Sequence, residues 1–317
     1  MERFIAVDCG KDDTKICVRN TDGTFTKRSF VTRMNELTGF ESLSGSRGYQ
    51  VEYDGRGYVV GDGATGITSN SNSKKELIHK IATLTAIASS VNNGDSVKVV
   101  IGCPLSFYPD KTEREEYANY ILPKGRIDIK INGQEKNFYI ASRLVLAESY
   151  GIVFYEPEKF NNKYVGVIDI GGLNLNAAAY KNNQLISDSC FTEKLGKNTI
   201  MKTLQTKLNE KLDADFSFDE MEIFIQQGYV TNAEKETADF MKNYFKEHLN
   251  KVWQKCTNNR WNLKYMDLVF IGGTSLLLRP YILEEFPNAY IPEDANFVNA
   301  EGFLMALCSA FHTGITK

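Results

Sequence analysis

The sequence predicts an α/β protein built from two similar halves. With 317 residues, the chain is long enough for two domains that each bury a sizeable core. A three-strand pattern at the N-terminus returns near residue 164. In both copies the first strand ends in an aspartate, Asp8 or Asp169, and a glycine follows two residues later. Such a repeat indicates one supersecondary unit that is used twice.

The first copy occupies the first thirty or so residues. Strand-like segments cover residues 4–8, 14–18 and 25–31, and Asp22-Gly23 supplies a tight turn before the third strand. Because short loops join the segments, we expect three antiparallel strands.

The rest of the first half mixes strand and helix patterns. Asp54-Gly55 and Asn132-Gly133 mark hairpin turns, and apolar residues at helical spacing follow Ser73, which lies near the expected helix cap. The expected elements are a hairpin over 49–60, a helix over 73–91, a buried strand over 97–102, a hairpin over 126–140 and a helix over 141–155.

The second half repeats the strands and adds longer helices. After its strand 266–271, a glycine turn at residues 272–275 brings backbone N–H groups and a helix start to one place. The other expected elements are strands over 164–169, 175–180 and 185–191 with a turn at 181–183, and helices over about 196–212, 233–256 and 276–285.

Composition restricts the class of protein. The chain has 42% hydrophobic residues, 24% charged residues and a net charge of −3, which is ordinary for a globular enzyme and argues against a direct nucleic-acid surface. Its first residues run directly into a strand pattern, without a signal peptide or a long apolar run, so we expect a cytoplasmic protein without a membrane contact. The six cysteines and three histidines are isolated, so neither disulfides nor a zinc site is expected.

Five motifs in family order resemble the actin-like ATPase superfamily, and within it the bacterial plasmid-segregation actins called ParM or StbA. The motifs span nearly the whole chain, and the Tyr58-Val59-Val60-Gly61-Asp62 stretch is also similar to segregation actins. Residues 8–15 look like the first phosphate loop, 146–151 like the first connecting helix, 169–174 like the second phosphate loop, 271–275 like the adenosine loop and 298–302 like the second connection.

The resemblance implies the actin-like ATPase fold, in which two ribonuclease-H-like domains flank a nucleotide cleft. Domain I would comprise residues 1–155 plus about 300–317, with a small subdomain within about 32–72, and domain II would comprise 156–299. The hinge would lie in structured crossings, since no Pro-rich linker separates the halves.

The resemblance also implies ATP, with GTP as the alternative, and Mg²⁺ as cofactors. Asp8 and Asp169 would hold the metal through its waters and take part in catalysis, because Mg²⁺ keeps several waters in its shell. Glu148 would orient or deprotonate the attacking water. The alternatives are two strand-end turn aspartates and a solvated helix carboxylate.

Nucleotide contacts follow from the same motifs. Lys15 would reach a phosphate, and its alternative is an outward-facing strand lysine. Lys11 could serve the phosphate-binding role instead. Lys11 and Asp12 depart from the small residues usual in this loop, and Asn176 stands where many relatives carry an aspartate. By analogy alone, base recognition would involve residues 222–227 and the helix after Gly196. The expected nucleotide-binding residues are Gly10, Lys11, Asp12, Asp13, Thr14, Lys15, Gly171, Gly172, Leu173, Asn174, Gly196, Asn198, Gly272, Gly273, Thr274 and Gly302, of which the last three glycines could instead be turn or helix-packing residues.

The resemblance favours a filament-forming ATPase that drives plasmid DNA segregation. Its partners would be further copies of itself and a ParR-like DNA-binding adaptor. The alternative is a small-metabolite kinase of the same superfamily, and a cell-shape or chaperone role ranks below both. The filament is favoured because the chain has neither the Cys-rich zinc motif of some sugar kinases nor an obvious acceptor-base aspartate in a glycine-rich sugar loop.

Overall fold

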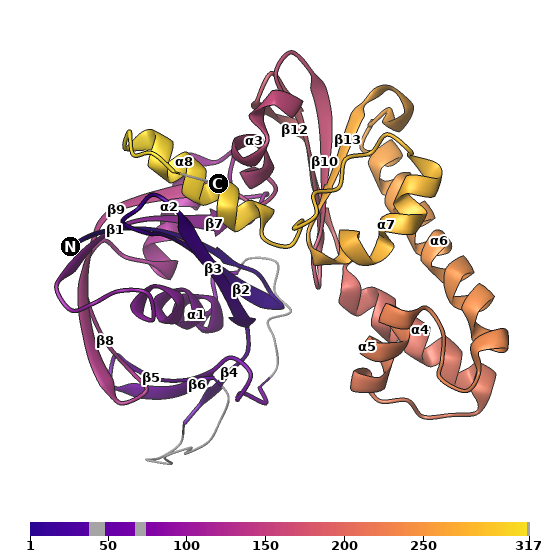
Figure 1. Ribbon diagram of the computed structural model, residues 1–317, viewed down its shortest axis with the longest axis horizontal. Coiled ribbons are helices and arrows are strands. Elements are labelled where there is room, and N and C mark those ends of the chain that lie inside the picture. Colours follow the sequence, from indigo (N-terminus) through magenta and orange to yellow (C-terminus); the bar gives the residue numbers. More distant parts are fainter. Residues whose placement is uncertain (38–47, 67–73, 316–317) are drawn as a thin grey trace. The chain divides into compact units, whose positions relative to one another are not determined.

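The computed structural model describes residues 1–37, 48–66 and 74–315, and the chain divides into two compact units (Figure 1). Unit 1 comprises Met1–Glu158 and Phe297–Lys317, and unit 2 comprises Lys159–Asn296. Each unit contains a β-sheet with helices packed against it. Among the described residues, no helix is both long and apolar enough to cross a membrane.

Unit 1 is built on a mixed sheet of nine strands in its described part, in the order β3-β2-β1-β7-β9-β8-β5-β6-β4. Strand β1 pairs antiparallel with β2 and parallel with β7, and β7 pairs parallel with β9. The strands are β1 (Glu2–Cys9), β2 (Asp13–Arg19), β3 (Phe25–Val31), β4 (Met34–Glu36), β5 (Tyr49–Tyr53), β6 (Arg56–Val60), β7 (Asp95–Cys103), β8 (Gly125–Ile131) and β9 (Gln134–Ala147).

Alternate residues of β1 belong to different cores, which places hydrophobic layers on both faces of this sheet. Ile5 and Val7 join the core that includes helix α1 (Leu77–Ala88), and Phe4 and Ala6 join the core of helix α8 (Val298–Ala310). A strand covered on both faces reads as a continuous apolar run, as the N-terminal sequence does. Unit 1 also contains α2 (Lys111–Ile121), α3 (Gly151–Tyr155) and a 3₁₀ turn at Pro157–Lys159.

Unit 2 has a four-stranded sheet in the order β12-β11-β10-β13. One core includes residues of β10, β11 and β13 together with residues of four helices. The elements are β10 (Tyr164–Ile170), β11 (Leu175–Lys181), β12 (Gln184–Glu193), α4 (Lys197–Leu212), α5 (Phe218–Gln227), α6 (Glu234–Asn258), a 3₁₀ turn at Leu263–Tyr265, β13 (Asp267–Ile271) and α7 (Gly273–Glu285).

The sequence repeat is confirmed as a structural repeat. The order β12-β11-β10-β13 in unit 2 reproduces β3-β2-β1-β7 in unit 1, with two antiparallel pairings followed by a parallel one. The first hairpins close with the same hydrogen bond, because Gly10 N donates to Asp13 O and Gly171 N donates to Asn174 O, both at 2.9 Å. The predicted α/β class is therefore confirmed.

The helix expected over residues 141–155 is wrong. Strand β9 continues to Ala147, and only Gly151–Tyr155 forms a helix. The apolar residues Leu144, Val145 and Leu146 suit either element. Parallel pairing with β7, from Lys98 opposite Ser142 to Cys103 opposite Ala147, decides for the strand.

Further differences concern the helices. Helix α1 begins at Leu77 with Glu76 as its N-cap residue, while the expected cap, Ser73, lies outside the described residues. Helix α7 begins at Gly273, three residues earlier than expected. Helix α2 was not expected, although Asp110 caps it by accepting hydrogen bonds from two backbone N–H groups.

Candidate functional site

Asp8 lies at the carboxyl end of β1, where the parallel strands β7 and β9 also end. Ligands of open α/β sheets bind at such carboxyl ends. The Asp8 side chain is buried, with 6% exposure. A Cβ atom on Gly102 of β7 would lie 3.4 Å from Asp8 Oδ1, so the neighbouring strand carries no side chain over this carboxylate.

The sequence led us to expect Glu148 in a helix. It lies instead in a tight turn that follows β9. Its backbone N donates to Cys103 O at 2.9 Å, and Ser149 adopts a left-handed conformation with φ 73°. The Glu148 residue is only 8% exposed. This burial excludes the alternative of a solvated helix carboxylate.

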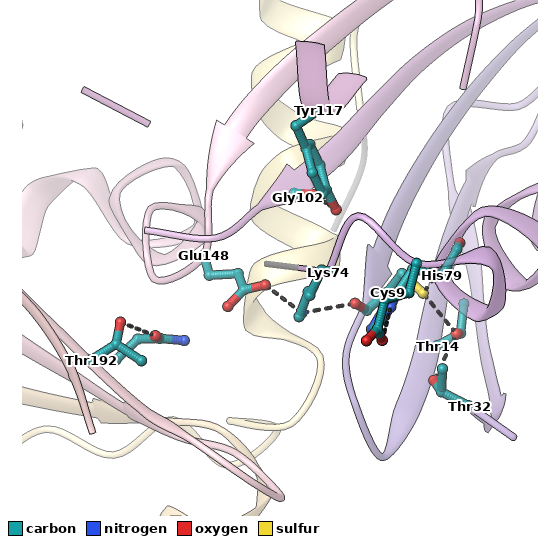
Figure 2. A network of polar contacts seen from close by, with 11 residues as sticks. Cys9, Thr14, Thr32, Lys74, His79, Gly102, Tyr117, Glu148 and Thr192 are labelled. Carbon is teal, nitrogen blue, oxygen red and sulfur yellow. Dashed lines mark hydrogen bonds and ion pairs between the residues drawn. The ribbon is translucent and has the colours of Figure 1, made fainter. Parts of the chain in front are cut away.

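A lysine that the sequence did not single out contacts Glu148. Lys74 Nζ forms an ion pair with Glu148 Oε1 and donates to the carbonyl of Cys9 at 2.8 Å (Figure 2). Burial by itself lowers the pKa of Lys74, but the charges of Glu148 and Asp8 outweigh it and the pKa is raised. The ammonium therefore stays protonated beside two carboxylates.

Lys74 carries no local sequence signal. It stands beside Lys75 between a polar stretch and a helix, where a lysine pair normally reads as a solvated surface. Only the fold brings it to Glu148, 74 residues away in the sequence.

The first loop combines a tight turn with two lysines. A Cβ atom on Gly10 would lie 2.7 Å from Asp13 O, so only glycine fits this turn without a shift. Lys15 is half-buried and lies opposite Asp8 in the β1–β2 register, on the same face of the sheet. Lys11 is buried, with 7% exposure.

Thr14 and His79 lie in the interior behind this loop. Thr14 is fully buried, and its hydroxyl lies 2.9 Å from Thr32 Oγ1 and 3.3 Å from Cys9 Sγ, which indicates a structural role (Figure 2). Burial, followed by the positive charges of Lys74 and Lys11, lowers the pKa of His79 to about 3. Its imidazole is therefore neutral at physiological pH.

Asp169 occupies in unit 2 the place that Asp8 occupies in unit 1. It lies at the end of β10, opposite Asn176 of β11 and Ile271 of β13, and it is 8% exposed. A Cβ atom on Gly272 would lie 2.5 Å from Asp169 Oδ1, and Gly272 itself has φ 86°. This glycine is required both by its backbone conformation and by the adjacent carboxylate.

Asn176, which departs from the family pattern, stands opposite Asp169 as Lys15 stands opposite Asp8. Its Oδ1 accepts a hydrogen bond of 2.8 Å from Thr192 Oγ1. The side chain therefore takes part in a contact within the sheet of unit 2.

The second loop is fastened to the starts of two helices. The backbone N of Lys197 donates to Gly171 O at 3.0 Å, and that of Asn198 donates to Gly172 O at 2.8 Å. Thr274 Oγ1 of α7 donates to Gly171 O at 2.9 Å. A Cβ atom on Gly196 would lie 2.4 Å from Gly172 O, so the loop and the start of α4 are in backbone contact. Carbonyl groups of the loop thus accept hydrogen bonds from backbone N–H groups at the start of α4.

Two expected nucleotide contacts have a defined environment. Asn174 Oδ1 is buried and has no hydrogen-bond partner among the described residues. It can therefore accept a hydrogen bond from a ligand or a water. The Cα of Gly302 packs against α3, since an added Cβ would lie 1.9 Å from Gly151 O. For Gly302 the structure favours helix packing.

Each unit thus gathers most of its own expected residues. Unit 1 brings Asp8, Gly10, Lys11, Lys15 and Glu148 to the carboxyl ends of its parallel strands. Unit 2 collects Asp169, Gly171, Gly172, Leu173, Asn174, Gly196, Asn198, Gly272, Gly273 and Thr274 around the ends of β10 and β13.

These features define a class of protein: a duplicated α/β fold in which each unit holds an aspartate beside a glycine loop at the end of its first strand. Comparison with known proteins agrees with this class. The family model for the N-terminal domain of actin-like proteins matches residues 6–151. No curated protein sequence matches the chain.

Three solved structures are similar over almost the whole chain. The Alp12 filament structure is 28% identical, covers 98% of this chain and 99% of its own, and has a TM-score of 0.76. The archaeal actin homologue Ta0583 in complex with ADP is 17% identical, with coverages of 96% and 98% and a TM-score of 0.76. A ParM filament from Clostridium botulinum is 15% identical, with coverages of 97% and 99% and a TM-score of 0.74. The chain is therefore similar to actin-like proteins, by the family model over residues 6–151 and by its fold over nearly its whole length.

Proposed function

We propose that this actin-like protein binds and hydrolyses a nucleoside triphosphate and assembles into filaments that segregate plasmid DNA. The observation that carries the proposal is the duplicated aspartate. Asp8 and Asp169 are both buried at the ends of equivalent strands, and both lie against glycine backbone. A repeat that keeps a carboxylate and a glycine loop in the same place twice suits phosphates and their metal ion.

In this proposal the two loops contact the phosphates of one nucleotide, which is ATP, with GTP as the alternative. Lys15 supplies a positive charge from the face of the sheet that carries Asp8. The unpartnered Asn174 Oδ1 can accept a hydrogen bond from a water of the bound metal. The residues around Gly272 and Thr274, at the start of α7, contact the nucleoside.

The donor set suits Mg²⁺, which prefers oxygen ligands and retains several of its waters. Carboxylates at Asp8 and Asp169 would accept hydrogen bonds from those waters. The metal would supply charge compensation for the triphosphate when bound.

Glu148 is the proposed catalytic residue. Hydrolysis adds the oxygen of a water to the γ-phosphorus, breaks the bond to the oxygen that bridges the β- and γ-phosphates, and releases a diphosphate and inorganic phosphate. The buried Glu148 carboxylate, on the same sheet end as Asp8, would orient that water or receive its proton.

The likeness to filament structures supports self-assembly. Alp12 and the ParM of Clostridium botulinum are described as filaments, and Ta0583 is described in complex with ADP. We therefore propose a cytoplasmic filament of many copies, linked to its DNA by a ParR-like adaptor and not by direct contact with nucleic acid. The chain's net charge of −3 agrees with an indirect link.

Light scattering, electron microscopy and phosphate release with Mg²⁺ and ATP or GTP test the proposal. We expect filaments above a critical concentration, and loss of turnover with weaker nucleotide binding in Asp8→Ala and Asp169→Ala. Asp188→Ala on the exposed face of β12 is the matched control and should behave as the parent.

A protein that stays monomeric with every nucleotide and salt tried would refute the filament. Transfer of the γ-phosphate to an added small molecule would establish the kinase instead. Parental turnover in either aspartate variant would refute the assignment of the metal.

A further inference from the structure

Lys74 is a buried cation of unit 1 that the proposed chemistry does not yet use. It is 5% exposed, lies just before α1 and adopts a left-handed backbone conformation with φ 51°. Its ammonium joins Glu148, which follows β9, to the carbonyl of Cys9, which ends β1 (Figure 2). One side chain thus connects the turn after β9 to the first loop.

If the contact between Lys74 and Glu148 served packing alone, two apolar side chains of the same size would serve as well. A buried lysine loses its hydration, and a buried pair with a carboxylate is commonly no more stable than an apolar pair of the same size. The ion pair does, however, fix charge and geometry. Glu148 stands in a tight turn, and the Lys74 ammonium contacts its carboxylate directly.

We propose that Lys74 is a positioning residue for Glu148, and that its ammonium holds this carboxylate fixed in direction while the attacking water is bound. This inference rests on the proposed function. Held in this direction by the ion pair, Glu148 acts on the water by accepting a hydrogen bond from it.

A double-mutant cycle separates this role from a structural role or a direct phosphate contact. The four proteins are the parent, Lys74→Met, Glu148→Gln and the double variant, each measured for nucleotide affinity, single-turnover phosphate release and thermal unfolding. Lys75→Met is the matched control, because this neighbouring ammonium pairs with the exposed Glu116 on α2.

We expect Lys74→Met to slow phosphate release by about 10- to 100-fold, with nucleotide affinity within about twofold of the parent. Lys74→Arg should recover part of the rate, and Lys75→Met should retain all of it. In the Glu148→Gln background, Lys74→Met should cause no further loss, since its effect passes through the Glu148 carboxylate.

Multiplicative losses in the double variant would overturn the inference, and so would a fall in nucleotide affinity at an unchanged rate. If thermal unfolding shows that Lys74→Met does not fold, Lys74→Gln takes its place in the same cycle, because an amide can still donate to Cys9 O. A parent without nucleotide binding or turnover would instead refute the proposed function. The two failures are therefore distinguishable.

Discussion

His248 gives unit 2 a pH-dependent stability that can be calculated from its environment. The residue is 2% exposed on α6, and its Nε2 lies 3.1 Å from Leu195 O. Burial lowers its pKa from 6.5 to about 4, although the hydrogen bond to Leu195 O opposes this shift. The folded unit therefore holds the imidazole neutral at pH values where the unfolded chain protonates it.

The sign follows from proton binding. Below pH 6.5 the unfolded chain binds a proton that the folded unit rejects, so the free energy of unfolding falls as the pH decreases from 6.5 towards 4. For these two pKa values, the loss between pH 7.5 and 5.0 is about 2 kcal/mol. At neutral pH the group contributes almost nothing to the pH dependence.

Urea unfolding followed by tryptophan fluorescence measures this loss. Both tryptophans of the chain, Trp253 and Trp261, lie in unit 2, so the signal reports on that unit. His248→Gln retains a donor for Leu195 O but does not titrate in this range. The drop in unfolding free energy from pH 7.5 to 5.0 should be smaller in this variant by about 2 kcal/mol.

His312→Gln is the matched control, because His312 is exposed and lies in unit 1. It should show the parental drop. If His248→Gln loses as much stability as the parent over this range, the assignment of a buried, neutral His248 is wrong.

Two further predictions concern Glu148, the proposed catalytic carboxylate, and the contact between helices α3 and α8. Glu148→Gln should release phosphate about 10²–10⁴-fold more slowly with near-parental nucleotide affinity, and its filaments should persist longer after dilution. Normal phosphate release in this variant would refute the catalytic role of Glu148. Gly302→Ala should lower the free energy of unfolding by about 1–3 kcal/mol, because the new Cβ would lie 1.9 Å from the Gly151 carbonyl. Circular dichroism in urea measures this, and Gly314→Ala, whose Cβ meets no atom within 4 Å, should be neutral.

Hairpins were predictable because their information is local. Asp22-Gly23, Asp54-Gly55 and Asn132-Gly133 each lie at a turn between observed antiparallel strands. Turn residues with left-handed backbones and alternating apolar neighbours act over a few positions, so the sequence contains them directly. The repeat was visible for the same reason, since Asp8 and Asp169 each precede a glycine at the same spacing.

The long strand β9 could not be assigned locally. Residues 141–147 suit a helix or a strand, and the observed strand exists because β7 offers a parallel partner from Lys98 to Cys103. Parallel pairing joins segments that are distant in the sequence, and no turn residue marks it. Because β9 extends to Ala147, Glu148 lies in the turn after the strand and not in the expected helix.

The sequence by itself determined the class of fold, the repeated unit and the identity of the two strand-end aspartates, because short-range patterning and glycine turns specify them. Only the tertiary structure decided that Lys74 meets Glu148, that Lys11 and Thr14 are buried, and that Gly302 packs against Gly151. The physical reason is burial. Whether a charged or small residue is solvated or enclosed depends on strands and helices that the chain brings together from distant positions, and a local pattern does not encode that proximity.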